Sequence, residues 1–424
     1  MENKYYKSRL IDKKIEKYLK AFGAICIEGP KWCGKTWTSG KFSNSVFMLA
    51  NPEGNFNNRK IAELNPSFAL NGLFPRLIDE WQEVPSIWDA VRYSVDNNQT
   101  KGQYILTGSS TVNVLSYIHS GAGRIAKIKM RPMSLYEQGF SNGLISIKDI
   151  ANNKIEECFT GEVSLDNLID YIIRGGWPAN TDLDIDIARL LPLEYINSIL
   201  NIDIYKLDNK RRDKHKIELL LRSLARNEST TVSNKVLKND IKEIDNEDVN
   251  IDSISEYLQL MERLFLLENT KPYSPKIRSS LRVKQSEKRH FVDPSLAVAI
   301  LKLNKEKLLG DLEYLGFLFE ALVERDLLIY SEANDLNMYH YQDYNNNEID
   351  AIIENEDGSW CGIEIKLGAN QIDQAAQNLL KINSKIIEKN GKPAKSLCVI
   401  CGLTNAAYRR KDGVIVVPLT SLKD

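Results

Sequence analysis

The sequence has few histidines and cysteines and no long apolar run, and each shortage argues against a class of protein. Of its 424 residues, four are histidine and six are cysteine, so a His-ligated metal centre and a disulfide scaffold have little support. No stretch of about 18 apolar residues is present to cross a bilayer. The N-terminal residues lack the apolar core of a signal peptide. We therefore expect a cytoplasmic protein with no membrane partner.

The sequence also lacks a large excess of acidic or of basic residues. The chain has 56 basic and 57 acidic side chains, which leaves a formal net charge of −1. Any nucleic-acid binding must therefore come from local basic patches. The hydrophobic content of 43% and the charged content of 27% are ordinary for a globular protein. At roughly 150 residues per domain, the length predicts about three domains.

Cys398 and Cys401 have the spacing of a redox or zinc-binding pair, but their surroundings favour a different interpretation. They belong to the apolar run 396–402, which is typical of a buried strand. No second cysteine pair or histidine pair accompanies them. We therefore predict that both thiols lie in the protein core.

A phosphate-binding loop is the strongest motif in the chain. The short apolar strand 24–28 is followed by a segment that matches G-x-x-x-x-G-K-[ST] at every fixed position. Its backbone N–H groups can cradle phosphates, its lysine can reach the β and γ phosphates, and its threonine can hold Mg²⁺. The nucleotide-binding residues predicted here are Gly29, Pro30, Lys31, Trp32, Cys33, Gly34, Lys35, Thr36 and the following Trp37.

Two further strand ends carry polar residues that suit nucleotide hydrolysis. The apolar run 74–78 ends in Asp79 and Glu80, which predicts a Mg²⁺-ordering aspartate and a glutamate that polarises the attacking water. The strand 103–106 leads into Thr107 and Ser109. These hydroxyls suit sensing of the γ-phosphate, and they equally suit a helix cap or turn.

The segments GPKWCGKT, LIDEWQEVP, YILTGSS and GRIAKIKMRPMSLYE together resemble the predicted AAA-type ATPases of bacteria and archaea that carry a C-terminal domain of unknown function. The resemblance implies an α/β fold with a P-loop ATPase core, a helical lid, a winged-helix-like segment and a restriction-endonuclease-like domain. It implies that Ser109 or Thr107 is the sensor and that Arg124 is an arginine finger, although Arg124 also fits a surface position. It places Pro178 against adenine and Arg174 near the γ-phosphate.

We divide the chain accordingly into residues 1–160 for the core, 161–226 for the helical lid, 227–292 for the winged-helix-like segment and 293–424 for the nuclease-like domain. The helix predicted at 250–264 carries acidic residues, which phosphates repel. The winged helix is therefore either a DNA-binding or a protein-docking module. The basic stretches 210–216 and 271–289 are candidates for phosphate contacts or are solvated surface.

The last third carries a second set of candidate catalytic residues. Asp350 enters one predicted strand, and Glu364 and Lys366 lie on one face of the next. This pattern resembles the PD-(D/E)xK nuclease core, although the first proline of that motif is missing. The resemblance implies that Asp350 and Glu364 hold Mg²⁺ or Mn²⁺, that Lys366 orients the attacking water, and that Glu320 and Gln374 complete the site. An ion-pair hairpin and an inactive nuclease fold are the alternatives.

Together these features predict an ATP-binding and ATP-hydrolysing enzyme that associates with DNA and carries a Mg²⁺-dependent nuclease site. The alternative is an ATP-controlled switch and scaffold that binds a protein partner through the winged helix and carries an inert nuclease-like domain as an adaptor. The sequence leaves the oligomeric state open, and with it the question whether Arg124 acts on a neighbouring subunit.

Overall fold

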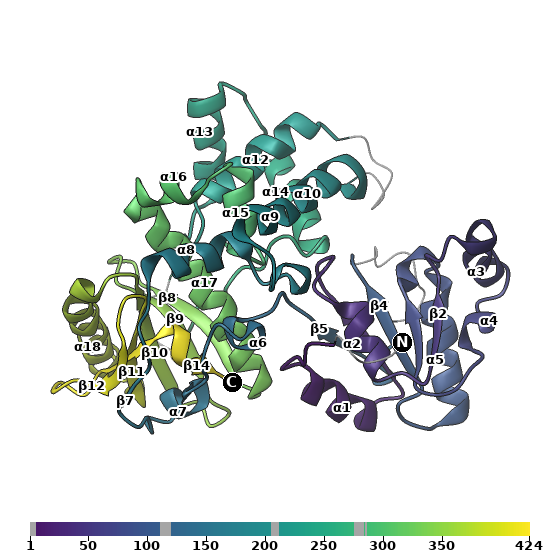
Figure 1. The fold of residues 1–424 in the computed structure, drawn as a ribbon, viewed down its shortest axis with the longest axis horizontal. Helices are drawn as coiled ribbons and strands as arrows, with labels where there is room; N and C mark the ends of the chain where they lie inside the picture. The colour runs from purple at the N-terminus through teal and green to yellow at the C-terminus, as the bar shows by residue number, and fades with distance from the viewer. Residues whose placement is uncertain (1–5, 111–119, 205–211, 275–283, 285) are drawn as a thin grey trace. The chain divides into compact units, whose positions relative to one another are not determined.

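The computed structural model describes residues 6–110, 120–204, 212–274, 284 and 286–424 (Figure 1). The chain folds into two compact units, and each is described by itself. The first unit comprises residues 1–132, 201–212 and 259–266, and the second comprises residues 133–200, 213–258 and 267–424. The predicted mixed α/β fold is confirmed in both.

The first unit is a five-stranded parallel sheet in the order β2-β3-β4-β1-β5. Alternate residues of β1 enter two different hydrophobic clusters, with Cys26 in one and Ile27 in the other. Both faces of the sheet are therefore covered, as parallel sheets require. The strands are β1 (Ala24–Glu28), β2 (Ser45–Met48), β3 (Arg76–Asp79), β4 (Tyr104–Gly108) and β5 (Ile125–Lys129). The helices are α1 (Asp12–Ala21), α2 (Lys35–Lys41), α3 (Glu53–Leu64), α4 (Ser67–Leu70) and α5 (Ser86–Asn98).

The strand order brings three predicted site segments to one edge of this sheet. Strand β4 lies between β1 and β3, and the carboxyl ends of parallel strands share an edge. The phosphate loop follows β1, Asp79 ends β3, and Thr107 lies near the end of β4. Residues far apart in sequence therefore meet at that edge.

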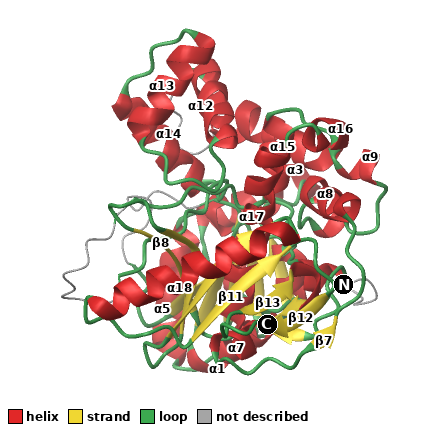
Figure 2. Ribbon diagram, turned by 90° about the vertical axis from the view of Figure 1, so that its left-hand side faces the viewer, coloured by secondary structure: helices red, strands yellow, loops and turns green. Residues whose placement is uncertain are grey.

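The second unit contains a seven-stranded mixed sheet in the order β7-β12-β13-β11-β10-β9-β8. Helix α18 (Ile372–Glu388) lies across its strands, as Figure 2 shows, and buries Leu379 against Val399 and Trp360. Cys398 and Cys401 are buried free thiols in β11, which confirms the core prediction. The strands are β7 (Cys158–Phe159), β8 (Asn337–Gln342), β9 (Glu348–Glu354), β10 (Trp360–Lys366), β11 (Ser396–Cys401), β12 (Ala406–Arg409) and β13 (Ile415–Pro418).

Two short strands pair residues 133–160 with C-terminal segments, one in the seven-stranded sheet and one in a separate two-stranded sheet. Strand β7 pairs with β12, and β6 (Ile145–Ser146) pairs with β14 (Leu422–Lys423). We expected the ATPase core to continue to residue 160, whereas the N-terminal segment of the first unit ends at Pro132. The difference arises because these pairings involve partners more than 240 residues away, which no local pattern reveals.

Helices make up the rest of the second unit. Helix α15 packs against α8, α10 and α12, and α17 runs along β8 and β10. None of the described helices has the length and hydropathy needed to cross a bilayer. The helices are α6 (Leu135–Gln138), α7 (Ile147–Ala151), α8 (Leu165–Arg174), α9 (Ile185–Ala188), α10 (Leu190–Ser198), α12 (Lys214–Arg226), α13 (Asn234–Asp245), α14 (Ile251–Arg263, which continues into the first unit), α15 (Pro294–Ile300), α16 (Lys305–Leu309) and α17 (Leu312–Ala333).

The segment expected to be a winged helix contains its predicted helices, α13 and α14. The two wing strands expected near residues 266 and 290 are reduced to isolated bridges, Leu267 with Phe291 and Thr270 with Lys288. Polar residues such as Asn269 between the bridges have low β-propensity, which accounts for the short pairing. The winged-helix assignment stays a prediction.

Candidate active sites

The phosphate loop connects β1 to α2 through residues with left-handed backbone angles. Gly34 has a φ of 99° and Trp32 a φ of 63°, so a glycine at position 34 avoids a steric cost. The buried Lys35 Nζ donates to the carbonyl oxygens of Gly29 at 2.9 Å and Pro30 at 2.7 Å. The ammonium therefore lies inside the curve of the loop, close to the backbone N–H groups that phosphate-binding loops use to bind phosphates.

The other loop side chains differ in exposure. Cys33 is fully buried, whereas Trp32 and Trp37 are 47% and 53% exposed. Lys31 forms a 2.5 Å ion pair with Asp203, a residue of the same unit. The Lys31 ammonium is therefore engaged within its own unit, and the two tryptophans lie at the solvent side of the loop.

Asp79 joins the phosphate loop to the neighbouring strand. Its Oδ1 accepts hydrogen bonds from Thr36 Oγ1 at 2.9 Å and Thr107 Oγ1 at 2.6 Å. Burial raises the pKa of the Asp79 carboxyl because ionisation is costly away from water. A hydroxyl beside a carboxylate offers the hard oxygen ligands that Mg²⁺ prefers. These residues therefore fit the metal expected with ATP.

Glu80 is held by the end of β4 and by its own turn. Its backbone is left-handed, with a φ of 56°, and its amide donates to Thr107 Oγ1 at 3.1 Å. Ser109 Oγ donates to Glu80 Oε2 at 3.0 Å, and the Gln82 side-chain amide binds the same oxygen. Sequence reasoning missed Gln82, for which proximity to Glu80 is the only signal. Both predicted sensor hydroxyls thus touch the acidic pair.

Arg124 does not lie with these residues. It precedes β5, whose first residue, Ile125, is paired with Ala24 at the start of β1. The phosphate loop follows the other end of β1, about 16 Å away for a five-residue strand. The guanidinium Nε donates to Asp96 at 2.7 Å. Arg124 is therefore at the edge of the sheet opposite the phosphate loop of its own chain.

Arg174 and Pro178 belong to the second unit. Arg174 donates to the carbonyl oxygens of Asn180 at 2.8 Å and Thr181 at 3.4 Å, so it closes the turn in which Pro178 begins a short 3-10 helix. The adjacent Trp177 is buried and donates to Ser295 Oγ at 3.0 Å. The adenine and γ-phosphate roles suggested for this turn stay predictions.

The second candidate site forms where β9 and β10 lie side by side. Lys366 Nζ lies 2.8 Å from Glu364 Oε2 and 3.3 Å from Asp350 Oδ2. Burial raises the pKa of Glu364 to about 8. Burial opposes ionisation of Asp350 as well, but the ammonium groups of Lys366 and Lys288 hold the pKa of this carboxyl below its ordinary value. The three residues that the resemblance grouped do lie together.

Lys288 is a part of this cluster that sequence reasoning placed elsewhere. Its side chain is completely buried, and its ammonium binds Glu320 and, at 3.1 Å, Glu324. Burial and the nearby Asp350 raise the pKa of Glu320 to about 7. The interpretation of Lys288 as a solvated residue available for DNA phosphates is therefore wrong, because an apolar and acidic environment encloses it.

Other expected contacts are also replaced by neighbours. Gln374 is exposed, and Asn378, one turn further along α18, donates to Glu364 Oε1 at 2.7 Å. Arg289 binds Val232 O and Asn234 Oδ1 at 2.9 and 2.7 Å, so it also fails as a free phosphate contact. Lys210, Arg211, Lys276, Arg278 and Arg282 lie outside the described residues.

The C-terminal carboxylates are not arranged as a metal site in this structure. Within the described part of the chain, no group of three or more His, Cys, Asp or Glu side chains could hold a metal ion. Asp350 and Glu364 converge on the Lys366 ammonium, and Glu320 and Glu324 on Lys288. Lysine ammonium groups thus stand where a divalent cation would neutralise these carboxylates.

Comparison with known protein families divides the chain into three regions. Residues 21–138 match an AAA domain, residues 165–307 match a domain of unknown function (DUF8612), and residues 315–422 match another (DUF4143). The first region is an AAA-type P-loop ATPase domain, and the last is a DUF4143 domain. The AAA domain supports ATP binding and hydrolysis by this chain.

Solved structures resemble the chain only distantly, at 12% identity in each case. A Walker-type ATPase of Pyrococcus abyssi matches over 71% of this chain and 97% of its own, with a TM-score of 0.43. A signal transduction ATPase with numerous domains from Pyrococcus horikoshii matches over 77% and 48%, with a TM-score of 0.24. The Aeropyrum pernix Orc1 protein, solved in complex with DNA, matches over 71% and 93%, with a TM-score of 0.22. No protein with a curated description matches the sequence.

Proposed function

We propose that the AAA-type domain hydrolyses ATP with Glu80 as the residue that polarises the attacking water. The observation that carries the proposal is the hydroxyl bridge at the sheet edge, where Thr107 joins the Asp79 carboxylate to the Glu80 amide. Lys35 and the loop backbone bind the phosphates, and Thr36 and Asp79 hold Mg²⁺, which neutralises phosphate charge when bound. Ser109 and Gln82 fix the Glu80 carboxylate until a water and the γ-phosphate are in line.

Removal of the loop ammonium tests this proposal. Lys35→Ala should abolish measurable ATP turnover, because Lys35 is the side chain that reaches the β and γ phosphates. Lys127→Ala is the matched control: Lys127 lies on the same sheet and pairs with Glu28 at 2.8 Å. The control should retain wild-type turnover. Unchanged turnover in Lys35→Ala would contradict the proposed site.

We further propose that the DUF4143 domain is a candidate Mg²⁺- or Mn²⁺-dependent nuclease that acts on DNA. The convergence of Asp350, Glu364 and Lys366 within 3.3 Å supports it, since paired carboxylates beside a lysine suit metal-assisted attack on a phosphodiester. A metal would have to displace the lysine ammonium groups from the carboxylates. Cleavage assays on DNA and RNA with Mg²⁺ or Mn²⁺, for wild type and Asp350→Ala, test it. Cleavage that survives in Asp350→Ala excludes this site.

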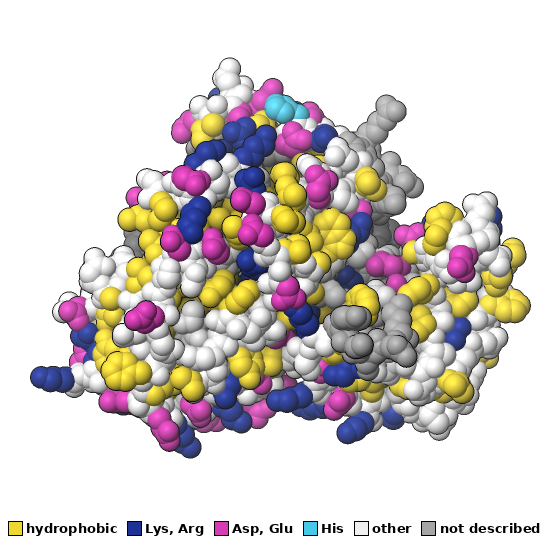
Figure 3. All heavy atoms as spheres, in the orientation of Figure 1, with side chains coloured by type: hydrophobic (Ala, Val, Ile, Leu, Met, Phe, Trp, Pro, Cys, Tyr) yellow, Lys and Arg dark blue, Asp and Glu magenta, His cyan; other side chains and the backbone are white. Residues whose placement is uncertain are grey.

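The alternative is an ATP-controlled switch that docks a protein through the winged-helix-like segment and carries an inert nuclease-like domain. The buried Lys288, whose ammonium binds both Glu320 and Glu324, favours this alternative. Acidic and basic side chains are also interspersed over the described residues on the face in Figure 3, without a broad basic field. DNA affinity that falls steeply with salt would support the DNA-binding proposal, and salt-independent binding of a protein would support the switch.

A further inference from the structure

The chain leaves the first unit at the Pro132–Met133 peptide bond, and polar contacts hold it on both sides of that bond. The AAA domain match extends beyond this point to residue 138. The last residues of the ATPase domain, 133–138, are therefore packed in the second unit. The contacts on each side of this peptide bond determine whether a displacement of the backbone in the first unit can reach the second.

On the first side, one arginine bridges the phosphate loop and the exit from β5. Arg9 Nη1 donates to Cys33 O in the loop at 2.8 Å, and Arg9 Nη2 donates to Arg131 O at 2.8 Å and Pro132 O at 3.2 Å. The side chain is buried, with 7% exposure. The planar guanidinium suits such a bridge because its donors point in fixed directions.

The segment that carries Arg9 is itself fastened to the helix after the loop. Asp12 accepts a hydrogen bond from Lys41 Nζ at 2.8 Å and one from the Arg9 amide at 3.3 Å. The Tyr6 hydroxyl donates to Asp12 Oδ1 at 2.7 Å and contacts Thr38 Oγ1 at 3.2 Å. Because Thr38 and Lys41 belong to α2, Arg9 is positioned by the same helix that positions Lys35 and Thr36.

The phosphate loop also contacts Met130, the residue that follows β5, directly. A Cβ on Gly29 would lie 2.1 Å from the carbonyl oxygen of Met130, so only glycine allows this approach. The Cys33 thiol lies 3.8 Å from the same oxygen. The loop therefore has little room to move without displacing residues 130–132.

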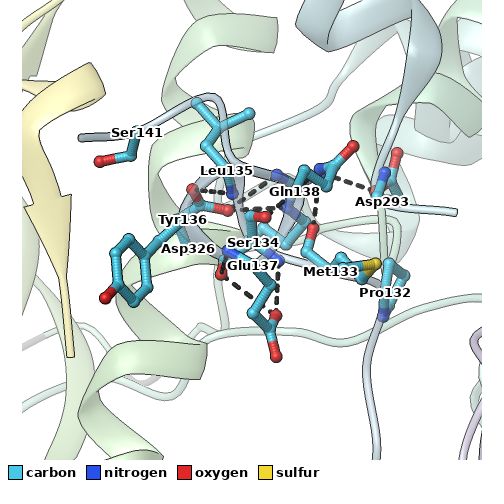
Figure 4. Close-up of polar contacts among 12 residues, drawn as sticks. Pro132, Met133, Ser134, Leu135, Tyr136, Glu137, Gln138, Ser141, Asp293 and Asp326 are labelled. Atoms are coloured by element: carbon cyan, nitrogen blue, oxygen red, sulfur yellow. Dashed lines mark hydrogen bonds and ion pairs between the residues drawn. The ribbon is translucent and has the colours of Figure 1, made fainter. Parts of the chain in front are cut away.

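On the second side, helix α17 clamps residues 133–138 (Figure 4). Leu135 N donates to Asp326 Oδ2 at 2.9 Å, and Met133 N donates to Gly176 O at 2.6 Å. Asp326 is buried and is held by Arg325 Nη2 at 2.7 Å. Helix α17 also carries Glu320, six residues before Asp326 and less than two turns away.

We propose that Arg9 is a positioning residue that couples the phosphate loop, through residues 131–138, to helix α17 and the carboxylate cluster of the DUF4143 domain. The inference rests on the proposed binding of ATP by this loop. Phosphates that enter the loop displace the Cys33 carbonyl, Arg9 carries that displacement to Arg131 and Pro132, and the Asp326 clamp passes it to α17. Such coupling requires evidence that both ends respond to one ligand.

Hydrogen exchange with and without a non-hydrolysable ATP analogue and Mg²⁺ tests the coupling. In wild type, the analogue should slow exchange in the phosphate loop and change exchange in 133–138 and α17 by about fivefold or more. Arg9→Ala should keep the loop protection and lose the distant change, and Arg9→Lys should restore part of it. Arg59→Ala, which removes a surface arginine paired with Glu63 and Glu83, should behave as wild type.

Asp326→Ala, which removes the acceptor of the Leu135 N–H, provides a second variant should Arg9→Ala fail to fold. It should lose the response of α17 while retaining protection of the loop. A full distant response in Arg9→Ala or in Asp326→Ala would overturn the coupling, as would a wild type that responds only in the loop. Absence of loop protection in wild type would instead contradict ATP binding, so failure of the proposed function is distinguishable from failure of this inference.

Discussion

The two acidic clusters of this protein differ in the groups that face their carboxylate oxygens. Asp79 and Glu80 are bonded by hydroxyl and amide groups, which carry no net charge. Asp350, Glu364 and Glu320 are bonded by the ammonium groups of Lys366 and Lys288. Two lysine ammonium groups therefore add positive charge to the second cluster, whereas the partners that bond the carboxylates of the first are uncharged.

Two pairs of neighbouring carboxylates can therefore lie in different electrostatic environments, one with neutral hydrogen-bond partners and one with lysine ammonium groups. A buried carboxylate without a counter-ion is costly, so we expect the second cluster to depend on its lysines for stability. The comparison predicts that lysine removal affects stability in the second unit and that loss of neutral partners affects turnover in the first.

The largest stability effect is expected from Lys288→Met. Loss of this fully buried ammonium leaves Glu320 and Glu324 without their counter-ion, which should cost about 3–5 kcal/mol of unfolding free energy. Lys127→Met, which breaks the partly exposed pair with Glu28, should cost less than about 1 kcal/mol. Urea denaturation measures both. Equal losses in the two variants would mean that the buried Lys288 ammonium contributes no more to stability than a partly exposed ion pair.

A smaller effect is expected from the pH dependence of stability. Burial raises the pKa of Glu228, in the same unit, to about 8. The folded state therefore keeps a proton that the unfolded state releases above about pH 4.5, and stability falls as the pH rises from there to about 8.

Glu228→Gln removes this contribution, so the variant should gain about 2–4 kcal/mol relative to wild type between pH 5 and pH 8. Urea denaturation at the two pH values measures the difference. Glu243→Gln, at an exposed position on α13, should show the wild-type slope. An unchanged slope in Glu228→Gln would mean that Glu228 is ionised in the folded protein at neutral pH.

Ser109→Ala should have a moderate effect in the first cluster. The variant loses the 3.0 Å hydrogen bond to Glu80, which should lower kcat by about three- to tenfold, the equivalent of one ordinary hydrogen bond. KM should change little, because the contact is to the proposed base and not to phosphate. Ser94→Ala, which removes a contact to Tyr104, is the control. A raised KM with unchanged kcat would assign Ser109 to binding.

The smallest effect is expected from Arg124→Ala. Its side chain is half exposed, pairs with Asp96 and lies at the edge of the sheet opposite the phosphate loop. Turnover per chain in dilute solution should therefore equal that of wild type. Measuring turnover across a range of protein concentrations distinguishes two cases. A defect that grows with concentration points to action on a second copy, and a defect at every concentration contradicts the geometry.

The sequence was informative where function depends on local patterns. The phosphate loop, Asp79 and Glu80 follow from residues adjacent in the chain, and parallel strand order then brings them together. The spacing of Glu364 and Lys366 likewise predicted a shared face of β10, where the Lys366 ammonium lies 2.8 Å from the Glu364 carboxylate.

Contacts between distant segments could not be predicted in this way. Lys288 was grouped with its basic neighbours, yet its partners Glu320 and Glu324 lie 32 and 36 residues further along the chain. Asn378 replaces Gln374 beside Glu364 because the rotation of α18 about its axis is set by packing. Arg9 has no recognisable motif, and its bridge depends on carbonyl groups brought close by the fold.

The most direct test of the account is ATP turnover by Glu80→Gln at saturating ATP and Mg²⁺, with nucleotide binding measured on the same sample. The substitution keeps the shape of the side chain but removes the base. We predict that binding is retained and that kcat falls by about 10²–10⁴-fold, the usual contribution of a positioned base. Turnover equal to wild type would contradict the assignment of the first cluster as the site of ATP hydrolysis.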